Sequence, residues 1–161
     1  MQKINVLAVQ INEHLPVIAD MMRQLQENEV LLWDKSAQWE DIEKDYLQYM
    51  VEMQEECEGL MLIAFGNHEP AGFIFGYLQE EDESRCEIST GRILYVSDGF
   101  VYPQYRKRGV YALLNEQLEN HYKNKGIKRM TRFTHARNQP MQQFLKKEGY
   151  EVTRLLYEKW L

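Results

Sequence analysis

The sequence is short of the residues and segments on which several classes of protein depend. Its two cysteines, Cys57 and Cys86, show no metal-ligand spacing, and its four histidines are scattered, so we expect no disulfide framework and no metal. No apolar run approaches the roughly 20 residues of a membrane-spanning helix. The first ten residues, MQKINVLAVQ, lack the pattern of a signal peptide. We therefore expect a soluble, cytoplasmic protein with no membrane partner.

Positive charge is also scarce. The chain has 19 Lys and Arg residues against 25 Asp and Glu, a formal net charge of −6 at pH 7. This balance argues against nucleic acid as a partner and weakly favours a small cationic one. The 161 residues, 44% of them hydrophobic and 27% charged, predict one domain over residues 1–161 with a single sizeable core.

Hydrophobic periodicity predicts an α+β fold with α/β/α layers. Strand-like runs cover residues 4–11, 60–66, 71–79, 92–102, 128–136 and 150–161. Helical spacing covers residues 13–28, 39–53, 110–125 and 138–148. The second and third strands form a hairpin around a four-residue turn, and Gly99 inside the fourth marks a bulge or a close backbone approach.

The segment YRKRGVYALL places three basic side chains and a glycine directly before a helix. A helix amino terminus presents unpaired N–H groups, and Gly109 would let an anion approach them. The segment is neither a Walker sequence nor a G-x-G-x-x-G fingerprint. It favours a phosphate-bearing ligand, with a solvated basic loop as the alternative.

Two blocks of the sequence resemble motifs of the GNAT superfamily of N-acetyltransferases. FVYPQYRKRGVYALL is similar to the family's acyl-CoA-binding motif, and ARNQPMQQFLKKEGY to its carboxyl-terminal motif. AGFIFGYL resembles the central hairpin, and the order of elements agrees along the whole chain. The matching positions are Val101, Pro103, Tyr105, Arg106 and Gly109 in the first block, and Asn138, Phe144, Gly149 and Tyr150 in the second.

This resemblance implies a GNAT-like, mixed, mostly antiparallel central sheet, flanked by helices, in which two parallel strands splay apart. It also implies that acetyl-CoA binds between these strands, with its pyrophosphate on the N–H groups of residues 108–112. A family member would carry its bulge at Gly99. The implied cofactor-binding residues are Phe100, Val101, Arg106, Arg108, Gly109, Val110, Tyr111, Ala112, Asn138 and Phe144.

The sequence departs from the family pattern at three positions. Tyr111 replaces the motif's last Gly or Ala, so we expect its ring to point away from the pyrophosphate. Leu145 stands where many members have a tyrosine that protonates the departing thiolate. A thiol has a pKa of about 8.5, so a water, Tyr150 or Tyr157 could serve instead. Tyr95 stands where some members keep a glutamate base.

The attacking amine needs a base, because an amine with a pKa of about 10.4 is mostly protonated at neutral pH. Asp98 is the first candidate, with a structural carboxylate beside Gly99 as the alternative. His135 is the second, with a packing histidine as the alternative. Trp33, Asp34 and Glu40 are expected to contact the acceptor, because the first two helices of this fold commonly wall the acceptor site.

The sequence therefore predicts an acetyl-CoA-dependent N-acetyltransferase that acts on a small, cationic primary amine. Two alternatives stay open: an acetyltransferase for protein lysines or amino termini, and a GNAT-fold module that binds acyl-CoA without catalysis. A homodimer is also compatible with the resemblance.

Overall fold

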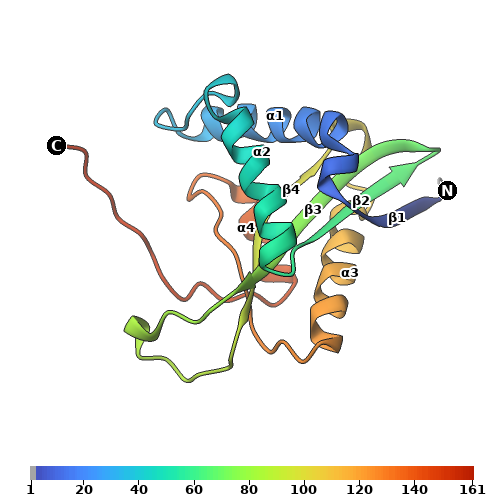
Figure 1. Ribbon diagram of the computed structural model, residues 1–161. Helices are drawn as coiled ribbons and strands as arrows, with labels where there is room; N and C mark the ends of the chain where they lie inside the picture. The colour runs from blue at the N-terminus through green and yellow to red at the C-terminus, as the bar shows by residue number, and fades with distance from the viewer. Residues whose placement is uncertain (1–2) are drawn as a thin grey trace.

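The computed structural model describes residues 3–161, which form a five-stranded sheet and four α-helices (Figure 1). The strands are β1 (Ile4–Val9), β2 (Leu60–Gly66), β3 (Glu69–Gln79), β4 (Ile93–Val101) and β5 (Met130–Thr131). The helices are α1 (Leu15–Leu32), α2 (Trp39–Glu56), α3 (Val110–Asn124) and α4 (Gln139–Lys147), with short 3₁₀ turns at Ile11–Glu13, Glu83–Arg85 and Pro103–Tyr105. No helix among residues 3–161 combines the length and the apolar character that crossing a bilayer requires.

The sheet confirms the α+β prediction. Its strands follow chain order, β1 to β5, and the first four pair antiparallel. β4 and β5 run parallel, so α3 is the crossover that connects them. They pair at Leu94↔Met130 and Tyr95↔Thr131 and then separate, so no strand among residues 3–161 pairs with the carboxyl-terminal half of β4 on that side. The resemblance had implied this splay.

Helices cover both faces of the sheet. Alternate residues of β3 enter different cores: Phe73 and Phe75 pack with α1 and α2, while Ile74 packs with α3. On the α1 and α2 face, the buried helix residues include Ile18 and Met50. Figure 1 shows these two helices on one side of the sheet and α3 on the other. The sheet is therefore the middle layer, and any site on it must open at an edge or between strands.

The predicted bulge is present, but at a different residue. Phe75 pairs with Asp98 and Gly76 pairs with Val96, so Ser97 is the extra residue. Placing the bulge at Gly99 was wrong, because Gly99 is regularly paired with Ile74. The insertion of Ser97 shifts the alternation of side chains along β4, and this shift decides the face on which Asp98 lies.

Other boundaries differ by a few residues. The β2–β3 turn has two residues rather than four, because Asn67 and His68 both adopt positive φ (51° and 68°), as a tight hairpin turn requires. The strand expected over residues 128–136 shrinks to Met130–Thr131, since β5 leaves its partner after two pairs. Helix α1 begins later and ends later than expected, at Leu15 and Leu32.

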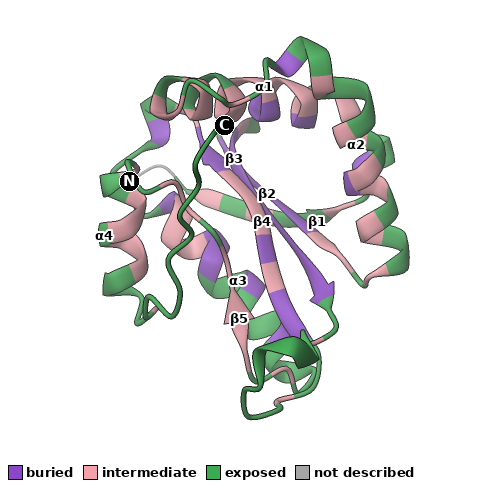
Figure 2. Cartoon of the chain, turned by 90° about the vertical axis from the view of Figure 1, so that its left-hand side faces the viewer, coloured by how far each residue is buried: buried purple, intermediate pink, exposed green. Residues whose placement is uncertain are grey.

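The strand expected over residues 150–161 is absent, and this prediction was wrong. Residues 151–161 have no regular secondary structure and are all exposed. Figure 2 shows this segment as a continuous exposed stretch crossing in front of the sheet. The alternating pattern is present in the sequence, but no strand among residues 3–161 pairs with this segment.

Candidate active site at the splayed strands

The amino terminus of α3 lines a cavity beside the splayed strands. Gly109 caps the helix with φ 76°, a left-handed conformation that glycine adopts without strain. Its carbonyl accepts the N–H of Leu113 at 3.0 Å, whereas the N–H groups of the first turn have no partner within the helix. These groups and the helix dipole make the terminus attractive to an anion.

Three basic residues stand in front of this terminus, and all are exposed. The Arg106 Nε donates to the carbonyl of Val101 at 2.9 Å, and its guanidinium lies 5.6 Å from the centre of the Phe100 ring. The Arg108 guanidinium lies 6.0 Å from the centre of the Tyr105 ring. Arg106 and Lys107 border a cavity of about 370 Å³, which is lined by Val101, Tyr105, Arg106, Lys107, Gly109, Val110, Tyr111, Ala112, Phe144, Lys147 and Glu148.

The free side of β4 offers backbone donors to this cavity. The N–H of Tyr102 donates to Ala71 across the β3–β4 ladder at 3.0 Å. Because neighbouring residues of an antiparallel strand alternate in direction, the N–H of Val101 points away from β3, toward the splay. The same alternation turns the amide of Phe100 toward β3. Phe100 and Val101 were both expected to bind the cofactor through their backbone. Of the two, Val101 is the one whose N–H points toward the splay.

Tyr111 occupies the space between the splayed strands. A Cβ placed on Gly99 would lie 2.6 Å from the Tyr111 hydroxyl, so this glycine is the close backbone approach that the sequence indicated. The ring packs edge-on against Phe144 with centroids 5.0 Å apart. Arg132 Nη1 donates to the hydroxyl at 3.1 Å, while burial raises the pKa of the Tyr111 phenol. The side chain therefore turns inward between β4 and β5.

Tyr150 and Tyr157, which were also considered as the acid that protonates the thiolate, are placed less favourably. The side chain of Tyr157 lies in the exposed segment 151–161. The Tyr150 hydroxyl is buried, with no hydrogen-bond partner among residues 3–161, and burial raises its pKa to about 12. The Arg132 guanidinium lies 5.4 Å from the Tyr150 ring centre and 5.8 Å from that of Tyr111, so the two phenols share one cation.

Asp98 lies on the opposite face of β4, toward α2. The Tyr46 hydroxyl lies within hydrogen-bonding distance of both carboxylate oxygens, at 3.1 and 3.0 Å, and is their donor. Burial raises the pKa of Asp98 to about 6, and the bond from Tyr46 offsets part of that rise. At neutral pH such a carboxylate is mostly ionised yet more basic than an exposed one, which suits a proton acceptor.

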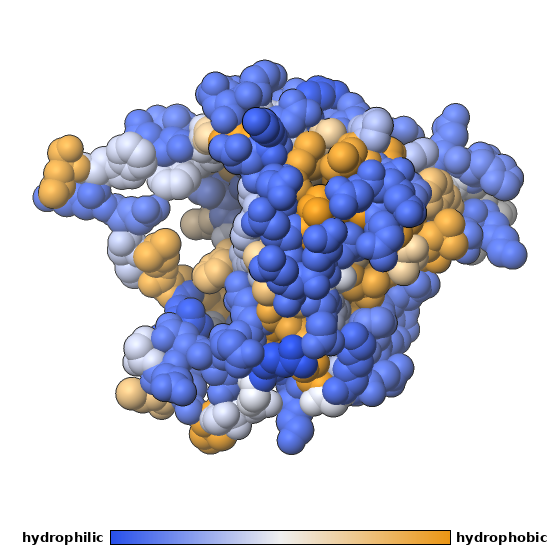
Figure 3. Space-filling view, in the orientation of Figure 1, coloured by the Kyte–Doolittle hydropathy of each residue, from blue (hydrophilic) through white to orange (hydrophobic). Residues whose placement is uncertain are grey.

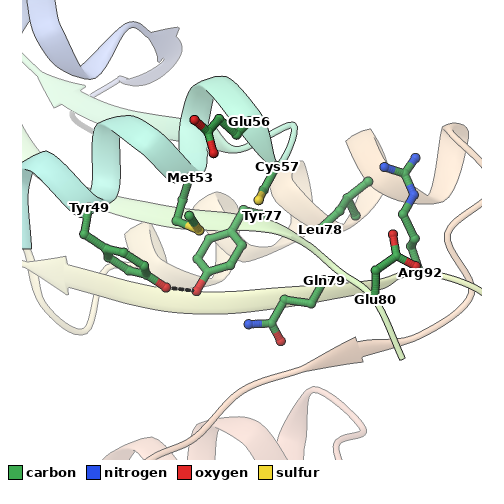
Figure 4. A pocket seen from close by; sticks show the side chains of 9 residues that line it. All are labelled: Tyr49, Met53, Glu56, Cys57, Tyr77, Leu78, Gln79, Glu80 and Arg92. Atoms are coloured by element: carbon green, nitrogen blue, oxygen red, sulfur yellow. Dashed lines mark hydrogen bonds between the residues drawn. The ribbon is translucent and has the colours of Figure 1, made fainter. Parts of the chain in front are cut away.

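A cluster of tyrosines connects Asp98 to a second cavity. The Tyr46 and Tyr49 rings lie 5.8 Å apart, the Tyr49 and Tyr77 hydroxyls are hydrogen-bonded, and Tyr77 packs edge-on against Tyr95 at 5.5 Å. Figure 4 shows the Tyr49–Tyr77 contact at one end of this cavity, whose volume is about 290 Å³. It is lined by Tyr49, Met53, Glu56, Cys57, Tyr77, Leu78, Gln79, Glu80 and Arg92.

Of the proposed acceptor residues, Trp33 lies beside His135, whereas Asp34 and Glu40 are exposed. The His135 ring packs 5.6 Å from the Trp33 ring, and its Nδ1 accepts the N–H of Arg137 at 3.2 Å. No hydrogen bond among residues 3–161 joins His135 to Asp98. Asp34 is exposed and pairs with Lys35 at 3.4 Å, and Glu40 is exposed in the first turn of α2. The structure thus brings Trp33 and His135 together.

Three residues of the site were not identified in the sequence. Tyr46 holds Asp98, and Arg132 holds both Tyr111 and the buried Asn115, whose Oδ1 accepts from Arg132 at 3.1 Å. Glu29 on α1 is a partly buried carboxylate whose pKa burial raises. Helical spacing indicated that Tyr46 faces inward, but its partner depended on the bulge in β4. Nothing in the local sequence distinguished Arg132 or Glu29 from surface charges.

Asn138 has a structural task in this chain. Its side-chain oxygen accepts the N–H of Met141 at 3.2 Å and so caps α4, the helix that carries Phe144.

Among residues 3–161, no group of three or more His, Cys, Asp or Glu side chains is arranged to hold a metal ion.

Comparison with known proteins gives one family. A search of curated proteins finds no match. Among solved structures, the aminoglycoside N-acetyltransferase AAC(6')-Iy in complex with CoA is 20% identical, with a TM-score of 0.73, over 99% of this chain and 96% of that one. A predicted acetyltransferase with acetyl-CoA from Clostridium acetobutylicum is 18% identical, with a TM-score of 0.75, over 98% and 96%. A mutant of the BH1408 protein from Bacillus halodurans is 15% identical, with a TM-score of 0.80, over 98% and 99%. The model of the acetyltransferase (GNAT) family matches residues 19–150, most of the sequence, and the chain belongs to that family.

Proposed function

We propose that the protein transfers an acetyl group from acetyl-CoA to a primary amine of a small cationic molecule. The observation that carries the proposal is the pairing of two features across β4. One face has an anion-binding helix terminus beside an unpaired N–H of Val101, and the other has Asp98, a carboxylate with a raised pKa. In the transfer, the acetyl carbon exchanges its bond to sulfur for a bond to nitrogen, and one proton passes from the amine to the thiolate.

The residues around the 370 Å³ cavity fit a CoA molecule. The first-turn N–H groups of α3 would hold the pyrophosphate, and Arg106 and Arg108 would add positive charge. The outward N–H of Val101 would hold the thioester carbonyl and stabilise the negative charge that develops on it. Phe144 would pack against the pantetheine arm. The relative AAC(6')-Iy, solved with CoA, supports the assignment of this cavity at the level of the fold.

Asp98 would accept the proton of the amine. Its pKa of about 6 leaves it mostly ionised at pH 7, and Tyr46 fixes both of its oxygens. His135, whose ring packs against Trp33, remains a second candidate. The thiolate would take its proton from Tyr111, because position 145 carries a leucine. The Tyr111 hydroxyl lies between the splayed strands, and the donor bond from Arg132 would stabilise its phenolate.

A cationic acceptor is favoured by what surrounds Asp98. Tyr46, Tyr49, Tyr77 and Tyr95 present aromatic faces and edges, and cations bind favourably over such faces. Glu29 adds a second partly buried carboxylate from α1. The relative AAC(6')-Iy has been solved in complex with a bisubstrate analogue, CoA-S-monomethyl-acetylneamine, and this supports an amine of a small molecule as the acceptor.

Calorimetric titration with acetyl-CoA tests the proposal first, with the double variant Arg106→Ala, Gly109→Glu as the control. The wild type should bind saturably, and the variant should lose binding because it lacks a cation and places a carboxylate at the helix terminus. Absence of binding by the wild type would refute the assignment of the cavity.

Release of free thiol across a panel of diamines, polyamines and aminoglycosides then tests catalysis. Asp98→Asn should lose turnover and keep its affinity for acetyl-CoA. If the wild type binds acetyl-CoA but releases thiol with neither these amines nor lysine peptides, the non-catalytic module is the better description, and Leu145 would fit it.

A further inference from the structure

Tyr111 fills the inner end of the space between β4 and β5. The family motif has a glycine or an alanine at this position, so the phenol ring is a feature of this chain. The two strands pair for the last time at Tyr95↔Thr131. Just beyond that pair, the Tyr111 hydroxyl lies against Gly99 of β4 and accepts a hydrogen bond from Arg132 at 3.1 Å. The ring therefore stands where the strands begin to separate.

Several neighbours hold the ring in this position. A Cβ on Gly99 would lie 2.6 Å from the hydroxyl, and Phe144 of α4 packs edge-on against the ring with centroids 5.0 Å apart. Arg132 is itself fixed, because its other terminal nitrogen donates to the Oδ1 of Asn115, a fully buried residue. Packed interiors resist a change of even one methylene group, so a ring held in this way acts as a wall.

The same ring lines the 370 Å³ cavity assigned to CoA. Under the proposed function, on which this inference rests, the pyrophosphate lies at the terminus of α3 and the thioester carbonyl accepts the N–H of Val101. The acyl group would then continue from Val101 toward the start of the splay, where Gly99 and the Tyr111 hydroxyl lie. The phenol would face the end of the acyl chain.

The length of strand between these positions limits the chain. Two residues of a strand span about 7 Å, which is the separation of Val101 and Gly99 along β4. A non-bonded carbon stays about 3.5 Å or more from the phenol, so about 3 Å remains beyond the thioester carbonyl. A carbon–carbon single bond is about 1.5 Å long, so this space takes the methyl group of acetyl and at most one more carbon.

We propose that Tyr111 selects the acyl donor: it admits acetyl-CoA and excludes acyl groups of four or more carbons. A longer chain that turned toward α2 would take the place of the attacking amine beside Asp98. On the face that α2 covers, hydrophilic residues predominate and the hydrophobic ones form separate patches (Figure 3). A chain lying there would gain little from leaving water. The other direction, toward α3, is the one that Tyr111 occupies.

Thiol release with acetyl-, propionyl-, butyryl- and hexanoyl-CoA measures this selection, with an amine that the wild type acetylates as the acceptor. The kcat/KM of the wild type should fall about 100-fold or more from acetyl- to butyryl-CoA. Tyr111→Ala should bring the two donors within about tenfold of each other. Tyr111→Phe is the matched control: like alanine it removes the hydroxyl, the proposed acid, but it keeps the ring. It should therefore turn over slowly and still discriminate as the wild type does.

Calorimetric titration with acetyl-CoA and butyryl-CoA makes the same comparison without turnover. The wild type should bind butyryl-CoA roughly tenfold or more weakly than acetyl-CoA, and Tyr111→Ala should bind both alike. If no amine is acetylated, the proposed function fails, and this titration still decides the role of Tyr111. Tyr111→Leu, with a shorter side chain that fills part of the space, takes the place of the alanine variant if that variant does not fold.

Two results would overturn the proposal. One is a wild type that uses or binds butyryl-CoA as well as it does acetyl-CoA. The other is a Tyr111→Ala or Tyr111→Leu variant that folds and discriminates between the donors as strongly as Tyr111→Phe does.

Discussion

Replacing Asp98 with asparagine should stabilise the fold at alkaline pH while it removes the proposed base. The carboxyl titrates near 3.8 when exposed and at about 6 in the folded chain. Because the pKa of this half-buried group rises from 3.8 to about 6, and a tenfold change in proton affinity corresponds to 1.36 kcal/mol, the folded state gives up at most about 3 kcal/mol when the group ionises. Asparagine carries no charge and keeps an oxygen for the hydroxyl of Tyr46, so the net gain should be about 1–3 kcal/mol.

The sign of the pH dependence follows from the raised pKa. Between pH 4 and 6 the folded wild type binds more protons at Asp98 than the unfolded chain does, so its free energy of unfolding falls as the pH rises. Below about pH 4 both states hold the proton, and the two proteins should be equally stable there. The difference should grow through pH 4–6 and level off above pH 7.

Urea unfolding of both proteins at pH 4, 5, 6 and 8 measures this difference. At pH 8 the variant should also melt higher, by roughly 2–10 °C for a domain of this size. In the kinetic assay, kcat/KM of the wild type should fall on the acid side with a midpoint near pH 6, and the variant should lose most of its activity without that limb. A stability difference that does not change with pH, or a less stable variant at pH 8, would refute the account of Asp98 as a destabilised buried carboxylate.

Three further predictions concern the splay and α4. Tyr111→Phe should lower kcat and leave KM for acetyl-CoA nearly unchanged, because the ring keeps its contact with Phe144; steady-state kinetics with varied acetyl-CoA separates the two. Gly99→Ala should cost about 1–3 kcal/mol in thermal unfolding, since its Cβ would meet the Tyr111 hydroxyl at 2.6 Å, and the double variant Gly99→Ala, Tyr111→Ala should cost less than the two changes added together. Asn138→Ala should cost about 1 kcal/mol in urea unfolding by removing the cap on Met141, and Asn138→Asp should retain most of it.

Most of the fold could be predicted because each segment carries its own period. The helical stripe after Gly109 and the apolar run Leu60–Gly66 depend only on neighbours in the sequence, and both elements are found where expected. The segment 150–161 has an equally clear period, yet it forms no strand. A strand needs a partner, and local pattern carries no information about whether that partner belongs to the same chain.

The candidate site likewise has one part that the sequence predicts and one part that it does not. The terminus of α3, the proposed anion site, was predictable because a glycine, a helix start and basic residues are adjacent in sequence. The environment of Asp98 was not, because it depends on Ser97. With strict alternation from Tyr95, Asp98 would face α3 and the hydroxyl of Tyr46 would lack its acceptor. One inserted residue turns the carboxylate toward α2, into the tyrosine cluster, and there burial raises its pKa to about 6. If Asp98 is the base, the bulge at Ser97 is what makes it one, so a deletion of Ser97 that restores regular pairing should abolish turnover while the α3 terminus still binds acetyl-CoA.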